Sequence, residues 1–317
     1  MKKSEFNIVF CVDNIYSVYL TVTVNSIIKN NNDIRIIIHV ISNYISDTNL
    51  RRLFDVINKS KNVELRIHLI DDNILEPLKT TKNWTIQTWY RILIPDILGI
   101  DVHTALYLDA DTIITGSLKE LLLIDLTDKA VAGVPEANYF NEEYYKRLNY
   151  EIEKGYICAG TLLMNLDFWR KNSLTKKMIE WAKRNYSILK MLDQDAINYF
   201  CRDTKLILSL KYGVVQWFFI NENFYQGSFL SQLREALESP IIIHYAFCNP
   251  WEKDSQRHIM FNEWEKYNRN LRNPVKRKYR SRGLLKIKII LWNIIHRKES
   301  NHYLTKMEVL RRIINHQ

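Results

Sequence analysis

The sequence contains little glycine, proline or cysteine: its 317 residues include 8 Gly, 6 Pro and 4 Cys. This scarcity of Gly and Pro excludes a collagen-like, linker-like or low-complexity chain. The four cysteines, Cys11, Cys158, Cys201 and Cys248, are widely spaced and form no CxxC pair. Their spacing argues against a disulfide framework and against a zinc knuckle.

Long apolar runs are also missing. No run reaches the roughly 18 residues that a membrane-spanning helix needs, and the N-terminus lacks the apolar core of a signal peptide. These features predict a cytoplasmic protein. Hydrophobic residues make up 47% of the chain and charged residues 25%, as is usual for a globular protein.

The net charge of +10 is concentrated near the C-terminus. Residues 269–317 contain 14 Lys and Arg against two Glu, whereas residues 1–268 contain 31 basic and 33 acidic residues. The sequence therefore divides into a near-neutral body over residues 1–268 and a basic helical tail over residues 269–317. Such a tail predicts contact with an anionic surface, either a membrane or a nucleic acid.

Within this tail, a basic run over residues 276–282 precedes an apolar segment over residues 284–295. The segment is too short to span a bilayer but suits an amphipathic helix at its surface. We therefore favour peripheral binding to the inner face of the membrane. Nucleic-acid binding would explain the tail but not the neutral body, so we expect no nucleic-acid partner.

Apolar runs alternate with helical periodicity along the chain. Strands are predicted over residues 8–12, 34–41, 63–70, 104–108, 130–134, 161–166 and 241–243. Helices are predicted over residues 16–29, 47–57, 85–98, 172–184 and 194–201, with Pro95 bending or ending the third of them. Strands that are apolar on both faces and alternate with helices indicate an α/β fold with a mostly parallel sheet.

Carboxylates follow two of these strands. Asp13 comes after the strand over residues 8–12, and Asp109 and Asp111 come after the strand over residues 104–108. Because ligands gather at the carboxyl ends of parallel strands, we treat these residues as one site. Two carboxylates one residue apart can bind Mg²⁺ or Mn²⁺, which would bridge a diphosphate. Taken alone, Asp-x-Asp also describes a solvated strand end.

His244 has a similar position at the end of the strand over residues 241–243. It is either a packed residue at the strand end or a third metal ligand, and an imidazole would favour Mn²⁺ over Mg²⁺. A metal-dependent sugar nucleotidyltransferase is the alternative function. Such an enzyme carries a Gly-rich basic phosphate loop near its first strand, and residues 11–16 contain no Gly, Lys or Arg.

Several blocks of sequence occur in a fixed order: IVFCVD at 8–13, YRILIP at 90–95, YLDADT at 107–112, AGTLLMNL at 159–166, DQD at 193–195 and HY at 244–245. In these blocks the chain, from about residue 7 to 251, resembles the family-8 glycosyltransferases, which include bacterial lipopolysaccharide galactosyl- and glucosyltransferases and glycogenin. The resemblance implies a Rossmann-like nucleotide-diphospho-sugar transferase (GT-A) fold. It also implies transfer of galactose or glucose, with retention of configuration, from a UDP-sugar to a hydroxyl of a glycan or lipid-linked acceptor.

The resemblance further implies roles for individual residues. It makes Asp109, Asp111 and His244 the Mn²⁺ ligands, places Asp13 and Tyr16 at the uracil and Arg91 at the phosphate or sugar, and makes Gln194 and Asp193 catalytic. Cys11, Ala110, Cys158 and Asn249 complete the implied donor site. Judged without the resemblance, Tyr16 could equally be core packing, Arg91 a surface residue of a helix and Asp193 a helix N-cap. For Gln194 we favour an amide carbonyl that stabilises the transition-state cation, and a covalent adduct remains an open alternative.

Three positions depart from the family pattern. Cys158 replaces an Asn and cannot donate the same hydrogen bonds to a sugar. Asn249 replaces a diphosphate-binding Lys in a shortened loop, and Lys253 is a candidate to compensate. Glu136 stands near a position where an acceptor-side Asp is common. These changes leave the metal site intact and the identity of the sugar open.

Overall fold

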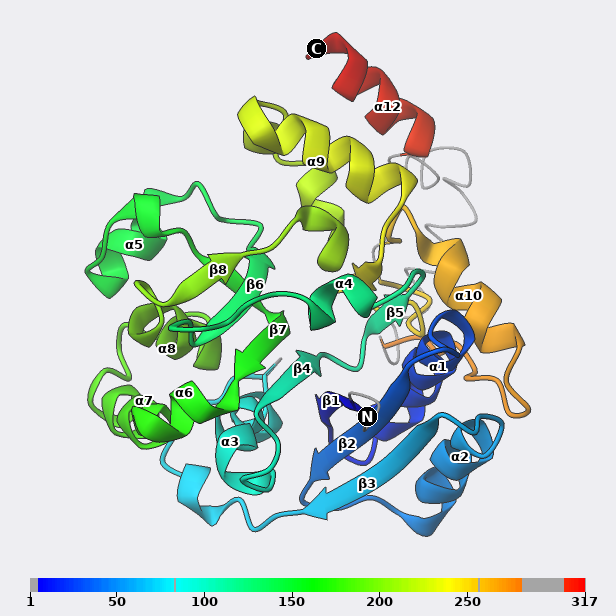
Figure 1. Cartoon of the computed structure of the whole chain (residues 1–317). Helices are drawn as coiled ribbons and strands as arrows, with labels where there is room; N and C mark the ends of the chain where they lie inside the picture. The colour runs from blue at the N-terminus through cyan, green and yellow to red at the C-terminus, as the bar shows by residue number, and fades with distance from the viewer. Residues whose placement is uncertain (1–4, 83, 256, 281–304, 317) are drawn as a thin grey trace.

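The computed structural model describes residues 5–82, 84–255, 257–280 and 305–316. Its centre is a seven-stranded sheet with the strand order β3-β2-β1-β4-β7-β6-β8 (Figure 1). The strands are β1 (Glu5–Cys11), β2 (Arg35–Ser42), β3 (Val63–Leu69), β4 (Thr104–Leu108), β6 (Val131–Pro135), β7 (Ile157–Asn165) and β8 (Lys205–Ile207). Only β7 runs against its neighbours, β4 and β6. The mostly parallel α/β sheet is therefore confirmed.

Short helices surround the sheet and form most of the remaining described chain. The α-helices are α1 (Tyr16–Asn30), α2 (Asp47–Ile57), α3 (Ile94–Ile97), α4 (Lys119–Leu122), α5 (Glu142–Leu148), α6 (Leu166–Lys171), α7 (Leu174–Arg184), α8 (Asp193–Phe200), α9 (Gly227–Glu238), α10 (Phe261–Arg269) and α12 (Lys306–Asn315). The 3₁₀ helices are η1 (Asn73–Leu75), η2 (Ile86–Leu93), η3 (Ile152–Lys154), η4 (Leu210–Tyr212), η5 (Gln216–Phe219) and η6 (Glu222–Phe224). None of the helices in the described part of the chain is both long and apolar enough to cross a bilayer.

The apolar strands are buried on both faces because each face has its own hydrophobic core. On β1, Ile8 and Phe10 pack into one core together with residues of α1 and α2. Val9, between them, points into the other core, which includes residues of η2, α7 and α8. Since successive side chains of a strand point to opposite faces, a strand between two cores is apolar throughout.

One predicted helix takes a different form. The segment expected to be one α-helix over residues 85–98 is a 3₁₀ helix, η2, followed by α3. Pro95 lies in the first turn of α3, where its missing N–H is not needed, and η2 ends just before it at Leu93, so the predicted interruption at Pro95 is present. The prediction of one α-helix was wrong because spacing alone does not separate a 3₁₀ helix from an α-helix. The helix predicted over residues 172–184 begins later, at Leu174, after Ser173 with φ of 51°.

A second, two-stranded sheet lies beside the main one and contains His244. In it, β5 (Thr112–Ile114) pairs antiparallel with β9 (Ile242–His244), so that Thr112 lies opposite His244. β5 follows β4 after only three residues. This pairing brings the segment after β4 next to a histidine that is distant in the sequence.

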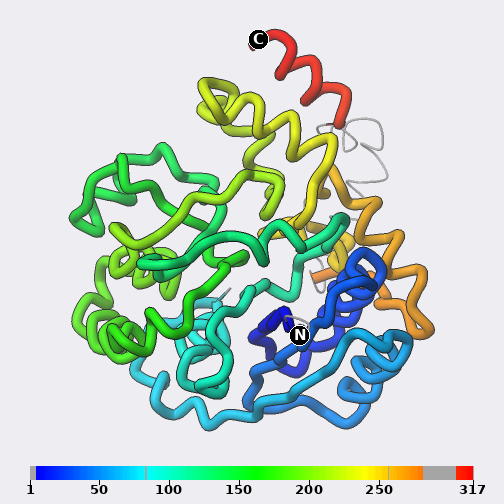
Figure 2. Tube along the Cα trace, viewed as in Figure 1, coloured from blue at the N-terminus to red at the C-terminus, as the bar shows by residue number. Residues whose placement is uncertain are grey.

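The C-terminal helix α12 packs along α9 at the edge of the molecule (Figure 2). Val309 and Ile313 on α12 are buried in the same core as α1. Thr305 and Glu308 form a capping box at its start. The apolar segment predicted over residues 284–295 lies outside the described residues.

Candidate active site

The carboxyl ends of β1 and β4 lie at the same edge of the sheet, because both strands pair in parallel. The N-terminal half of β7 reaches this edge from the other direction, and the Asp109 N–H donates to the Gly160 carbonyl at 2.9 Å. A cavity of about 700 Å³ opens here. It is lined by all the residues that the sequence predicts at the donor site: Cys11, Asp13, Tyr16, Arg91, Asp109, Ala110, Asp111, Cys158, Asp193, Gln194, His244 and Asn249.

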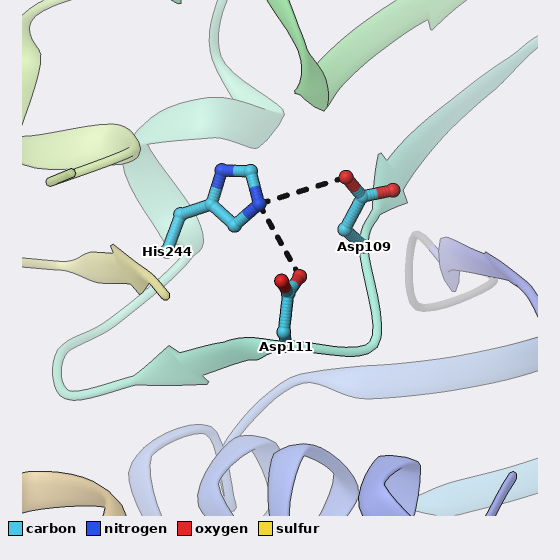
Figure 3. A group of neighbouring side chains, drawn as sticks. All are labelled: Asp109, Asp111 and His244. Atoms are coloured by element: carbon cyan, nitrogen blue, oxygen red, sulfur yellow. Dashed lines mark ion pairs between the residues drawn. The ribbon is translucent and has the colours of Figure 1, made fainter. Parts of the chain in front are cut away.

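Asp109, Asp111 and His244 point toward one another at the base of this cavity (Figure 3). His244 Nε2 lies 3.2 Å from Asp111 Oδ1 and 3.6 Å from Asp109 Oδ2. One ligand atom from each residue falls within 4.8 Å of the other two. Two carboxylates and an imidazole suit Mn²⁺, and the residues fit a divalent cation in both spacing and chemistry.

Gly160 gives this group the room that it needs. A Cβ at position 160 would lie 2.2 Å from His244 Cε1 and 2.9 Å from Asp109 Oδ2, closer than real Cβ contacts come. Any side chain would therefore push these two residues apart. The glycine of the AGTLLMNL block is explained by this close approach and not by a special backbone angle.

The charge on His244 depends on its acidic neighbours. Burial lowers the pKa of the imidazole, but Asp111 raises it, and the result is a pKa well above the usual value. Without a cation between them, the imidazolium and the carboxylates pair with one another. A metal ion bound here would take the place of that proton, because only the neutral imidazole can bind it.

The two oxygens of Asp109 have separate partners. Oδ1 accepts a hydrogen bond from the Tyr107 hydroxyl at 2.5 Å and lies 3.2 Å from an Arg91 nitrogen. Oδ2 is the oxygen that faces His244. Tyr107 and Arg91 thus fix one oxygen and leave the other for a cation. Tyr107 belongs to the YLDADT block and lies two residues before Asp109, so the alternation of side chains along β4 turns both to the same side.

Arg91 is a buried ion-pair partner, with 7% of its surface exposed. Its Nε lies 2.9 Å from Asp193 Oδ2, and Nη1 donates to the Ala159 carbonyl at 2.5 Å. Its guanidinium also stacks over the Tyr107 ring, 4.5 Å from the centroid. The alternative that Arg91 is a surface residue of a helix was wrong, since η2 turns it toward the sheet.

Asp193 and Gln194 begin α8 and form another wall of the cavity. Burial raises the pKa of Asp193 to about 7, against the lowering effect of Arg91. The side-chain oxygen of Gln194, Oε1, accepts a hydrogen bond from the Ala159 N–H at 2.8 Å. Its Nε2 is buried and makes no hydrogen bond to the described residues. The Gln194 amide also acts on the nearby Tyr156 hydroxyl, and the amide oxygen that we expected to face the cation is already engaged by Ala159.

Just after the carboxyl end of β1, the Tyr16 N–H donates to Asp13 Oδ1 at 2.7 Å. The Tyr16 ring is 39% exposed and meets Trp251 edge to face. Trp251 itself stacks on Tyr19 at 3.9 Å between centroids. Tyr16 is therefore not part of the buried core, because the residue is exposed and lines the cavity.

The positions that depart from the family pattern also surround the cavity. Cys158 Sγ lies 4.0 Å from His244 Nδ1, and Asn249 Nδ2 donates to Glu252 Oε1 at 3.2 Å. Glu136 lines the cavity, and burial raises its pKa. Lys253 is not among the lining residues, and its ammonium lies over the Tyr279 ring at 5.4 Å. The structure therefore gives no support to Lys253 as the compensating cation.

The residues that line the cavity without having been predicted from the sequence include Lys82, Trp84, Trp217 and Phe247. Trp84 precedes η2 and Phe247 follows β9, and their rings meet edge to face at 6.0 Å. Isolated aromatic residues in loops carry no periodic signal. Only the fold shows that these two lie together at the cavity.

Comparison with known proteins gives consistent results. The sequence model described as Glycosyl transferase family 8 matches residues 7–255. A lipopolysaccharide 1,2-glucosyltransferase of Escherichia coli is 28% identical over 255 residues, covering 79% of this chain and 74% of the relative. A lipopolysaccharide 1,3-galactosyltransferase of Salmonella typhimurium is 26% identical over 258 residues, covering 78% and 73%. The crystal structure of the galactosyltransferase LgtC with donor and acceptor sugar analogs superposes with a TM-score of 0.76 at 21% identity, covering 84% of this chain and 97% of the other.

Proposed function

As a chain that belongs to glycosyl transferase family 8, this protein is a glycosyltransferase, and we propose that it moves galactose or glucose from a UDP-sugar to a glycan or lipid-linked acceptor. We further propose that the reaction retains the anomeric configuration and depends on Mn²⁺. The observation that carries the proposal is the Asp109, Asp111 and His244 group, whose ligand atoms lie within 4.8 Å of one another at the cavity. The lipopolysaccharide hexosyltransferases among its relatives support a hexose donor.

A divalent cation held by these three residues would neutralise the diphosphate as the glycosidic bond breaks. Tyr16 has an exposed ring that can stack on the uracil, and Asp13 beside it can accept a hydrogen bond from the base. Asp193 can accept hydrogen bonds from sugar hydroxyls, and Arg91 holds it in position. These contacts would fix the donor at both of its ends.

If no covalent adduct forms, retention requires that the acceptor hydroxyl attack the face from which UDP leaves, with the hydroxyl proton passing to an oxygen of the departing diphosphate. Gln194 is a poor nucleophile, so we propose that it orients the reactants and does not form a stable adduct. Its Nε2 can donate to an oxygen of the donor sugar or acceptor, because its carbonyl is engaged by Ala159. The developing positive charge on the sugar is then stabilised by the departing diphosphate on the same face.

A donor screen tests this function. The protein is incubated with UDP-galactose, UDP-glucose or UDP-N-acetylglucosamine, and released UDP is quantified by chromatography with Mn²⁺ and with EDTA. We expect slow hydrolysis of one of the two UDP-hexoses that stops with EDTA, because the leaving diphosphate then loses its counter-charge. ADP-glucose controls for recognition of the base. Hydrolysis that continues unchanged with EDTA would refute the metal dependence, and synthesis of a UDP-sugar from UTP and a sugar phosphate would favour the nucleotidyltransferase.

We also propose that the basic tail binds an anionic membrane and brings the enzyme to a lipid-carried acceptor. Each Lys or Arg near such a surface contributes about 1 kcal/mol. Truncation after residue 268 is a poor test, because Leu271, Val275, Val309 and Ile313 are buried in the main core. Substitutions within residues 284–295 leave these four buried residues in place.

Flotation with phosphatidylglycerol vesicles measures the predicted binding. We expect the unmodified protein to float with the vesicles, and Lys286→Glu with Lys288→Glu to remain at the bottom because both charges are reversed. The control is Lys176→Glu with Lys177→Glu on α7. It makes the same change in net charge at two exposed positions outside the tail. Equal flotation of all three proteins would refute the proposal.

A further inference from the structure

The segment over residues 276–280 lies against the loop that follows His244. The Lys278 N–H donates to the Trp251 carbonyl at 2.8 Å, and the Lys253 N–H donates back to the Lys278 carbonyl at 2.9 Å. These bonds join a piece of the predicted tail to the loop that leaves the metal group. The beginning of the tail is thereby part of the wall around the active site.

Side chains strengthen this attachment. Arg277 Nε donates to the Pro250 carbonyl at 2.8 Å, and its Nη2 donates to the Glu252 carbonyl at 3.2 Å. The Arg277 guanidinium also stacks over Phe261 of α10, 4.6 Å from the ring centroid. Arg277 therefore has a structural role, and its contacts fix the path of the residues that follow it.

Those next residues reach the cavity. The Arg280 N–H donates to Asp254 Oδ1 at 2.7 Å, and both Arg280 and Asp254 line the cavity. We propose that Arg280 binds the diphosphate of the sugar donor, an inference that rests on the function proposed above. The tail would then supply a donor-binding residue that the body of the enzyme lacks.

The charge of the cavity is the main argument. Its lining includes seven acidic residues: Asp13, Asp109, Asp111, Glu136, Asp193, Glu252 and Asp254. Among the residues that the structure describes, three Lys or Arg line it: Lys82, Arg91 and Arg280. A nucleotide diphosphate is itself strongly anionic, and one divalent cation offsets only part of this excess. The donor therefore needs further positive charge from side chains.

Of the three basic residues, Arg91 is already held between Asp109 and Asp193. The loop after His244 brings the neutral Asn249 and two acids to the cavity, and its own Lys253 lies over Tyr279 instead. Arg280 is attached to this same loop by its backbone hydrogen bond to Asp254, and it lines the same cavity as the metal group. Its planar guanidinium can present two parallel N–H groups to phosphate oxygens, which the Lys82 ammonium cannot do.

Binding of UDP and of uridine to the full-length protein, both with Mn²⁺, tests the assignment. We expect Arg280→Gln to bind UDP about tenfold more weakly, the loss of one charge-assisted contact, and uridine within about twofold of the unmodified protein. Calorimetry measures UDP, and an NMR titration measures uridine. Lys276→Gln, at an exposed residue of the same segment that does not line the cavity, is the matched control and should change neither.

Three results would overturn the assignment: unchanged UDP affinity in Arg280→Gln, an equal loss of UDP and uridine, or a UDP-selective loss in Lys82→Gln and not in Arg280→Gln. If the unmodified protein bound no UDP, the proposed function itself would fail, so the two failures are distinguishable. Asn249→Lys added to Arg280→Gln should recover most of the UDP affinity, because it returns a positive charge to the cavity. A double variant no better than Arg280→Gln would contradict charge as the cause.

Discussion

Replacing Asp111 by Asn should reduce sugar transfer about a thousandfold at saturating donor, even with Mn²⁺ in excess. The amide keeps the shape of the side chain but lacks the negative charge that attracts a cation. Asp111 is the better choice than Asp109, because Asp109 also binds Arg91 and Tyr107, and its loss would disturb both. Initial rates of UDP release across a series of Mn²⁺ concentrations measure the effect.

The matched control for this variant is Asp203→Asn, an exposed acid paired with Lys154 away from the cavity. It should transfer sugar at the unmodified rate. Electron paramagnetic resonance of free Mn²⁺ should show that Asp111→Asn leaves the ion in solution, and circular dichroism should show that the variant is folded, which separates loss of metal from misfolding. Near-normal transfer by Asp111→Asn would contradict the metal role of the group.

Arg91→Met should have the largest effect on stability, about 3–5 kcal/mol in the free energy of unfolding. The change leaves Asp109 and Asp193 facing each other without the guanidinium between them, and it removes the donor to the Ala159 carbonyl. Arg91→Lys should cost less, because it keeps the charge but not all of the contacts. Urea unfolding monitored by tryptophan fluorescence measures the difference. Arg184→Met, at an exposed arginine on α7, is the control.

The effect of Arg91→Met should depend on pH with a definite sign. Burial already raises the pKa of Asp193 to about 7, and Arg91 opposes that rise. Without Arg91 the pKa rises further, so stability is lost as pH increases from the unfolded value of an aspartate toward the folded one. The deficit should therefore be smaller at about pH 5 than at about pH 8. A small deficit that is equal at both would contradict the buried ion pair.

Strands β1, β2 and β4 could be predicted because their central residues are mostly apolar and buried, whereas β3 lies at the edge of the sheet and is only partly buried. The pairing of β5 with β9 could not be predicted, since both are three residues long and meet only through the tertiary fold. The 3₁₀ form of η2 was missed for a related reason: its apolar spacing also suits an α-helix. That difference matters, because η2 carries the buried Arg91.

The candidate site could be predicted in outline and not in its details. Asp13 and Asp109 follow apolar strands, so their position at one edge of the sheet follows from the strand pattern. The sequence cannot show that one oxygen of Asp109 accepts from Tyr107 while the other faces His244. Nor can it show that the amide nitrogen of Gln194 is buried. The sequence gives even less indication that Arg280 lines the cavity, because its position depends on hydrogen bonds between residues 251–254 and residues 278–280.

The central claim is that Asp109, Asp111 and His244 bind a divalent cation that in turn binds the donor diphosphate. Calorimetric titration of UDP into the unmodified protein, once with excess Mn²⁺ and once with excess EDTA, tests it most directly. We predict UDP affinity at least about tenfold higher with Mn²⁺, and no such difference in Asp111→Asn. Equal UDP affinity with Mn²⁺ and with EDTA in the unmodified protein would contradict the claim.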